Sequence, residues 1–124
     1  MARDVKTSFP ESGGSTVHLA VYVPSTKNIS DDIGKMAHKK RVLEVVKFLQ
    51  KTYHGSTRYK AMGNFYSKKL GRDVDEEVTR VETYTTPKDY QNNIKELKKF
   101  LNRKKIDWSQ EEIGFEFEEE LHFV

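Results

Sequence analysis

The order of hydrophobic periodicities along the chain constrains its fold more than any other sequence feature. Two segments with helical spacing of apolar residues each stand between segments in which apolar and polar residues alternate. Alternation with a period of two indicates a half-buried strand, and apolar spacing at i, i+3, i+4 and i+7 indicates an amphipathic helix. The sequence therefore predicts the element order strand, helix, strand, strand, helix, strand.

The first strand is the clearest of the four predicted ones. In residues 16–23 every second residue is valine or leucine, and Pro24 ends the run. Residues 57–67 and 73–85 are expected to pair as a hairpin. The last strand is expected near Ile113, where apolar residues alternate with glycine and glutamate.

The predicted helices have recognisable ends. The first runs to about His54, with Ser30 as its N-cap and Gly55 in the left-handed conformation that terminates helices. The second begins after Thr86, a capping residue followed by proline, and ends within residues 102–107.

This order of elements is that of a ferredoxin-like α+β sandwich. Right-handed crossovers would place both helices on one face of a four-stranded antiparallel sheet. We expect one domain over residues 16–124, preceded by a flexible polar tail over residues 1–15. The opposite face of the sheet is then left open, and function is expected there.

Composition excludes several classes of protein. The chain has no cysteine, so disulfide frameworks, thiolate nucleophiles and cysteine zinc sites are excluded. The sequence shows no secretory signal and no apolar run of the ~20 residues that span a bilayer. The four histidines fall on separate predicted elements. We therefore expect a cytoplasmic protein with no membrane contact, no metal and no cofactor.

Alternation brings three chemically useful side chains to the open face. These are His18, Glu82 and Glu116, on neighbouring predicted strands. A histidine beside carboxylates is suited to proton transfer, so these residues form the candidate catalytic group. Arg80, which can grip an anion in bidentate fashion, and the aromatic residues Tyr22 and Tyr84 are expected to bind ligand. The alternative is a ladder of opposite charges on a solvated sheet.

Basic residues gather in the first half of the chain and could follow a phosphate backbone. The residues concerned are Lys39, Lys40, Arg41, Lys47, Lys51 and Arg58. Nucleic acid would then bind the helical side, since Glu82 and Glu116 repel phosphates on the open face.

Several short segments carry a resemblance to a known family. They are residues 19–22, the run from Phe48 to Thr57, residues 63–66, the stretch from Gly71 to Val81, and residues 110–113. On these the chain resembles an uncharacterised family of small bacterial, archaeal and mobile-element proteins, classed as a domain of unknown function. The resemblance implies a ferredoxin-like fold and no particular activity.

The sequence favours a non-enzymatic interaction or regulatory module over an enzyme. An open sheet face with aromatic residues suits pairing with a second copy, so a homodimer is expected. Two alternatives stay open: a nucleic-acid binder that uses the basic helical face, and a small enzyme that uses His18 with Glu82 and Glu116.

Overall fold

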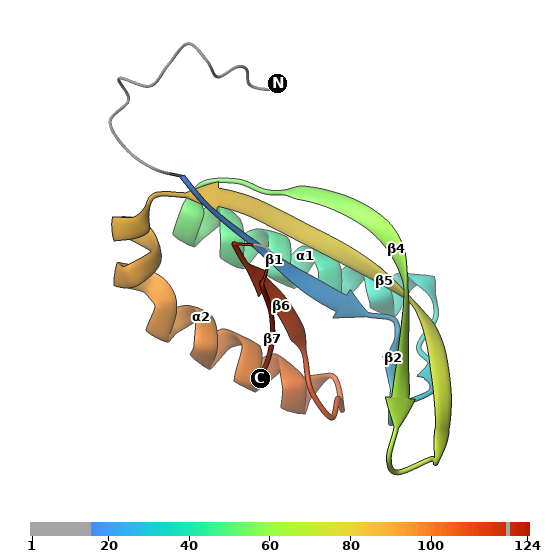
Figure 1. Cartoon of the computed structure of the whole chain (residues 1–124). Helices are drawn as coiled ribbons and strands as arrows, with labels where there is room; N and C mark the ends of the chain where they lie inside the picture. The colour runs from blue at the N-terminus through green and yellow to red at the C-terminus, as the bar shows by residue number, and fades with distance from the viewer. Residues whose placement is uncertain (1–15, 119) are drawn as a thin grey trace.

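A computed structural model gives the structure of the chain and describes residues 16–118 and 120–124. The tail predicted over residues 1–15 lies outside the described residues. Five strands form one antiparallel sheet in the order β4-β5-β1-β6-β7, and β2 pairs with β3 in a separate small sheet (Figure 1). The elements are β1 (Val17–Pro24), β2 (Thr26–Lys27), β3 (Asp31–Asp32), α1 (Lys35–Tyr53), β4 (Thr57–Ser67), β5 (Arg72–Thr85), α2 (Pro87–Asp107), β6 (Gly114–Phe117) and β7 (Glu120–Phe123).

The predicted ferredoxin-like sandwich, a four-stranded sheet with both helices on one face, is wrong. The large sheet has five strands because the chain turns after β6 and β7 pairs along its edge, from Gly114 opposite Phe123 to Phe117 opposite Glu120. Glu118 makes the turn with a φ of 52°. The sequence predicted one strand near Ile113 and did not show β7, because four residues are too few to show a period. The small β2–β3 sheet was also not predicted.

The start of α1 differs from the prediction. Ser30 is not its N-cap: α1 begins after Gly34, whose N–H donates to the Asp32 carboxylate at 2.7 Å. Asp31 and Asp32 form β3 and pair with β2, so they precede the helix and no acidic residue stands in its first turn. At the other end His54, rather than Gly55, takes the left-handed conformation, with a φ of 76°.

The predicted start of α2 is confirmed. The Thr86 hydroxyl accepts a hydrogen bond from the Asp89 N–H at 3.1 Å, and Pro87 occupies the first turn, where its missing N–H costs nothing. The helix ends at Asp107, within the predicted range, and Trp108 follows as its C-cap.

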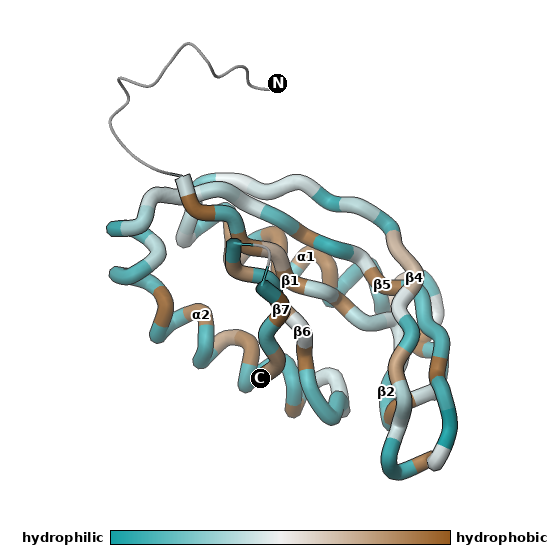
Figure 2. Tube along the Cα trace, in the orientation of Figure 1, coloured by the Kyte–Doolittle hydropathy of each residue, from teal (hydrophilic) through white to brown (hydrophobic). Residues whose placement is uncertain are grey.

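Both helices and the sheet share one core cluster. Figure 2 shows apolar positions recurring among polar ones along α1 and α2. The rings of Phe48 on α1 and Phe100 on α2 stack at 4.2 Å, which joins the two helices. The cluster also includes the valines and leucine of β1, so the residues between them point to the other face of the sheet. In the described part of the chain, no helix has the length and apolarity needed to cross a membrane.

The hairpin of β4 and β5 extends past the end of β1. β1 pairs with β5 only as far as Val78, whereas β4 pairs with β5 as far as Arg72. Residues 72–77 of β5 therefore have a partner strand on one side only. We call this stretch, with the part of β4 paired to it, the overhanging arm; it is visible in Figure 1 beyond the tip of β1.

Candidate functional site

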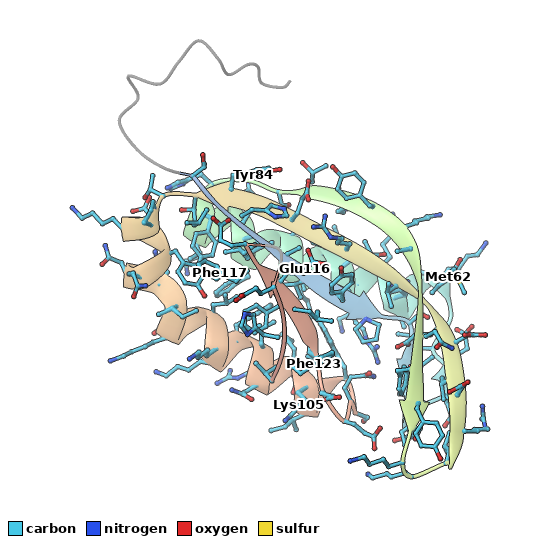
Figure 3. The ribbon with its side chains drawn as sticks, in the orientation of Figure 1. Met62, Tyr84, Lys105, Glu116, Phe117 and Phe123 are labelled. Carbon is cyan, nitrogen blue, oxygen red and sulfur yellow. The ribbon has the colours of Figure 1, made fainter. Side chains whose placement is uncertain are left out.

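Charged side chains cross the central strands on the face that points away from the core. The register sets Ala20 of β1 opposite both Glu82 of β5 and Glu116 of β6. Because the alanine side chain is small, it leaves open the space above β1 between the two carboxylates. Figure 3 labels Glu116 on β6 at this position.

Arg80 spans the gap between these carboxylates. One terminal nitrogen of its guanidinium donates to Glu116 Oε1 at 2.9 Å, and the other donates to Glu82 Oε1. The Tyr22 hydroxyl donates to the second oxygen of Glu116. One guanidinium therefore holds β5 and β6 together across β1.

His18 and Tyr59 complete this set of contacts. His18 Nε2 lies 2.9 Å from Glu82 Oε1, and the Tyr59 hydroxyl donates to Glu82 Oε2 at 2.9 Å. The Tyr84 ring lies over His18, with 4.7 Å between the ring centroids. We call His18, Tyr22, Tyr59, Arg80, Glu82 and Glu116 the Arg80 network.

The Arg80 network favours charged carboxylates. Burial alone would raise the pKa of Glu116, but hydrogen bonds from Tyr22 and Arg80 outweigh burial and hold that pKa below its ordinary value. Burial would also raise the pKa of Glu82. Hydrogen bonds from Arg80 and His18 outweigh this effect and hold that pKa below its ordinary value. Burial and the bond to Glu116 raise the pKa of Tyr22, so its hydroxyl stays protonated at neutral pH.

A pocket of about 330 Å³ opens beside the Arg80 network, on the same face. Tyr22 belongs to both, since its side chain lines the pocket and its hydroxyl binds Glu116. The two edge strands of the sheet both contribute, β4 through Met62 and its neighbours and β7 through Leu121 and Phe123. The sheet therefore curls around this face. Met62 and Phe123 are labelled in Figure 3.

The charged residues in the pocket lining are all acidic. They are Glu76, Glu111 and Glu112, among otherwise apolar, aromatic or uncharged residues. No lysine, arginine or histidine of the described residues lines it, in a chain whose net charge is +3. We call it the acidic pocket, and it suits a ligand with an apolar body and a positive charge.

A buried arginine fixes the loops behind the acidic pocket. Arg41 of α1 donates to the carbonyl oxygens of Pro24 and Thr26, both at 2.8 Å, and of Trp108 at 3.2 Å. The Gln110 amide, which lines the pocket, donates to Thr26 O at 2.6 Å and to Trp108 O at 2.9 Å. The loop after β1 and the loop after α2 therefore form one unit.

The structure brings the predicted open-face residues together. His18 and Glu82 are in direct contact, and Arg80 links Glu82 to Glu116. Tyr22 reaches the acidic pocket, whereas Tyr84 is exposed on the far side of His18. The guanidinium expected to hold an anion is occupied by the two carboxylates.

The residues predicted to bind nucleic acid differ in their exposure to solvent. Lys39, Lys40, Lys47 and Lys51 are exposed on α1, and Arg58 is exposed on β4. Arg41 is only 7% exposed, and its donors are used by backbone carbonyls rather than turned to solvent.

Sequence reasoning missed the acidic pocket and Glu76 within it. Glu76 stands in a run of acidic residues on β5, and no local pattern distinguishes it from its neighbours Asp75 and Glu77. The one available signal is Gly63, because a glycine inside a strand indicates a bulge or a close approach of backbone. The register sets Gly63 opposite Glu76, and both line the pocket. Within residues 16–118 and 120–124 no group of three histidine, aspartate or glutamate side chains is placed to hold a metal ion.

No family model matches the sequence, and no curated protein does either. Among solved structures, the fold is similar to that of a phage SAM lyase in complex with S-methyl-5′-thioadenosine. The TM-score is 0.65 and the sequence identity 12%, and the likeness covers 90% of this chain and 91% of that chain. At this identity the likeness shows the fold alone.

This likeness corrects two functional predictions. The solved protein that shares the fold over nine-tenths of the chain is an enzyme, with a small molecule bound. The prediction of a non-enzymatic interaction module is therefore wrong, and so is the expectation that an enzyme is the less favoured class, whereas the homodimer stays a prediction. The first of these predictions took the open face as a surface for another protein, whereas the structure shows a pocket there.

Proposed function

We propose that the chain is a lyase that acts on S-adenosylmethionine (SAM), a sulfonium nucleoside, and releases S-methyl-5′-thioadenosine. The acidic pocket is the observation that carries this proposal. Its volume of about 330 Å³ falls in the usual range of small-molecule sites, and its charged lining residues are all glutamates. The shared fold with a phage SAM lyase supports the same assignment.

The substrate and the acidic pocket are chemically complementary. SAM joins an adenosine, which has a flat aromatic base, to a positively charged sulfur and an amino-acid chain. Aromatic side chains such as Phe123 and Tyr66 can pack against the base. Carboxylates attract the positive charge, and this attraction strengthens where apolar walls exclude water.

The reaction breaks the bond between sulfur and the amino-acid chain. The bonding electron pair moves onto sulfur, so the sulfonium becomes the neutral thioether of S-methyl-5′-thioadenosine. The amino-acid fragment compensates for the lost bond internally, because an oxygen of its own carboxylate bonds to the carbon that leaves sulfur and closes a ring, so no proton acceptor is needed. Water is not added, which distinguishes a lyase from a hydrolase.

Tyr22 is the proposed catalytic residue of this chain, because its side chain lines the acidic pocket. Its raised pKa keeps the hydroxyl protonated, so it orients substrate as a neutral group rather than as a base. Glu116 and Arg80 are positioning residues, since Glu116 accepts the Tyr22 hydroxyl and Arg80 holds Glu116. Glu82 acts less directly, because it binds Arg80, and His18 acts through its contact with Glu82.

The test is a direct assay of product formation. The purified full chain is incubated with SAM, and S-methyl-5′-thioadenosine is measured by liquid chromatography and mass spectrometry. We expect product well above the spontaneous breakdown seen with heat-denatured protein. Tyr22→Phe should lower kcat about 100-fold if the hydroxyl positions the reacting groups.

The matched control is Lys39→Ala on the exposed side of α1, which should keep the wild-type rate. A wild-type rate equal to spontaneous breakdown would reject the proposed function.

A further inference from the structure

The overhanging arm places one carboxylate inside the acidic pocket. Glu76 lies on β5 beyond the end of β1, so no neighbouring strand covers it on that side. On the other side its partner is Gly63, which has no side chain. A Cβ on Gly63 would lie 3.5 Å from Val78 and 3.8 Å from the Glu76 carbonyl oxygen, in space that now belongs to the pocket.

Glu76 is held in place by neutral groups. The hydroxyl of Thr26, a buried residue, donates to Glu76 Oε2 at 2.7 Å. The nearby Arg41 guanidinium is committed to the backbone carbonyls of Pro24, Thr26 and Trp108. Among the residues that the structure describes, Glu76 forms no ion pair.

The surroundings of Glu76 make its negative charge costly. Burial raises the pKa of Glu76, and the bonds from Thr26 and the Ser25 backbone only partly oppose this. A half-buried carboxylate beside an apolar pocket is normally compensated by a cation. This protein supplies such a cation in direct contact to Glu82 and Glu116, through Arg80. Arg41 and His38 act on Glu76 only from beyond ion-pair distance, and their attraction does not outweigh the effect of burial on its pKa.

We propose that Glu76 forms an ion pair with the positive charge of the bound substrate and thereby discriminates between a cationic ligand and a neutral one. This inference rests on the proposed function, in which a cationic substrate gives a neutral nucleoside product. The substrate gains the attraction of Glu76, whose half-buried position strengthens it. S-methyl-5′-thioadenosine gains none, so the same residue that retains the substrate favours release of the product.

The experiment compares two stable ligands by calorimetry. Sinefungin resembles SAM but carries an amine in place of the sulfonium, so it is cationic and is not cleaved; S-methyl-5′-thioadenosine is neutral. Glu76→Gln keeps the shape of the side chain and removes its charge. We expect about tenfold weaker binding of sinefungin and less than twofold change for S-methyl-5′-thioadenosine.

Two further variants control for the fold and for long-range charge. Glu77→Gln removes the same charge from the next residue, which is exposed and outside the pocket lining, and should leave both affinities unchanged. Thr26→Val removes the hydroxyl that holds Glu76 Oε2 and should weaken sinefungin binding by less than Glu76→Gln does.

The outcomes separate this inference from the proposed function. If Glu76→Gln weakens both ligands equally, or neither, the inference is overturned, even if the wild type still releases S-methyl-5′-thioadenosine from SAM. If the wild type releases none but its sinefungin binding depends on Glu76, the ion-pair inference stands and the proposed activity fails. Binding of neither ligand by the wild type overturns both.

Discussion

The Arg80 network and the acidic pocket lie side by side on one face of the sheet, but their carboxylates are compensated differently. In the network, Glu82 and Glu116 share one guanidinium and accept further bonds from His18, Tyr59 and Tyr22. In the pocket, Glu76 accepts a hydrogen bond from the Thr26 hydroxyl and forms no ion pair within the described residues. The protein thus supplies its own cation where carboxylates tie strands together, whereas no ion pair of the described residues involves the glutamates of the acidic pocket.

The largest effect that tests this contrast should come from Arg80→Leu. The substitution leaves Glu82 and Glu116 without their shared cation at positions that are mostly buried. We expect the free energy of unfolding to fall by about 3 kcal/mol, measured by urea denaturation. Arg58→Leu, at an exposed position on β4, is the control and should change it by less than about 0.5 kcal/mol. Equal effects would show that the network contributes no special stability.

The second test changes the shape of the pocket rather than its charge. A Cβ on Gly114 would lie 3.4 Å from Phe123 and 3.5 Å from Leu121, at the pocket wall formed by β7. Gly114→Leu should therefore fill the pocket and weaken binding of S-methyl-5′-thioadenosine at least about tenfold, or about 1.4 kcal/mol. Gly114→Ala adds only ordinary contacts and should bind nearly as well. Unchanged binding by the leucine variant would place the ligand elsewhere.

Glu116→Gln should destabilise the protein at neutral pH by about 1 kcal/mol, because it replaces a charge-assisted bond to Arg80. The folded-state pKa of Glu116 lies below its ordinary value, so its contribution is present above the unfolded pKa and is lost as pH falls through the folded pKa. The difference between wild type and variant in urea denaturation should therefore shrink in acid. A difference independent of pH would contradict the role given to the charge.

The smallest expected effect has the opposite sign. The folded-state pKa of Glu76 is raised, so the charged carboxylate costs stability above that pKa and costs nothing below the unfolded pKa. Without ligand, Glu76→Gln should stabilise the protein by about 0.5 kcal/mol at pH 7, and the gain should vanish as pH falls toward about 4. Glu77→Gln is the control. Destabilisation by Glu76→Gln would mean that its charge is compensated within the protein.

Strand periodicity was enough to predict which residues share the face of the sheet that points away from the core. Alternation in residues 16–23 sets His18 and Tyr22 on the side away from the core, and the same rule assigns Arg80, Glu82 and Glu116. Successive side chains of a strand point to opposite faces, so whether a position is odd or even within its strand decides its face. These assignments are therefore correct although the predicted number of strands is wrong. Parity cannot show that Arg80 joins the two carboxylates, because that contact depends on the register between strands.

The acidic pocket could not be predicted, because no single segment encodes it. Its walls come from the overhanging arm, from residues 110–113 and from β7, and they meet only when the sheet curls. The length of the arm is set by where β1 ends relative to β5, which is a property of pairing and not of either strand alone. Glu76 becomes distinctive only through that geometry, opposite Gly63 and beside Thr26.

Arg41 shows how a residue outside the lining of the acidic pocket can set the position of a side chain within it. Its guanidinium binds three carbonyl oxygens from two loops, and Thr26, which holds Glu76, belongs to one of them. A lysine ammonium at this position would have no planar fork with which to span these acceptors. A library of variants aimed at altered ligand selectivity should therefore randomise α1 around Arg41 as well as the lining residues. Small shifts of this helix would move Thr26, whose hydroxyl holds Glu76.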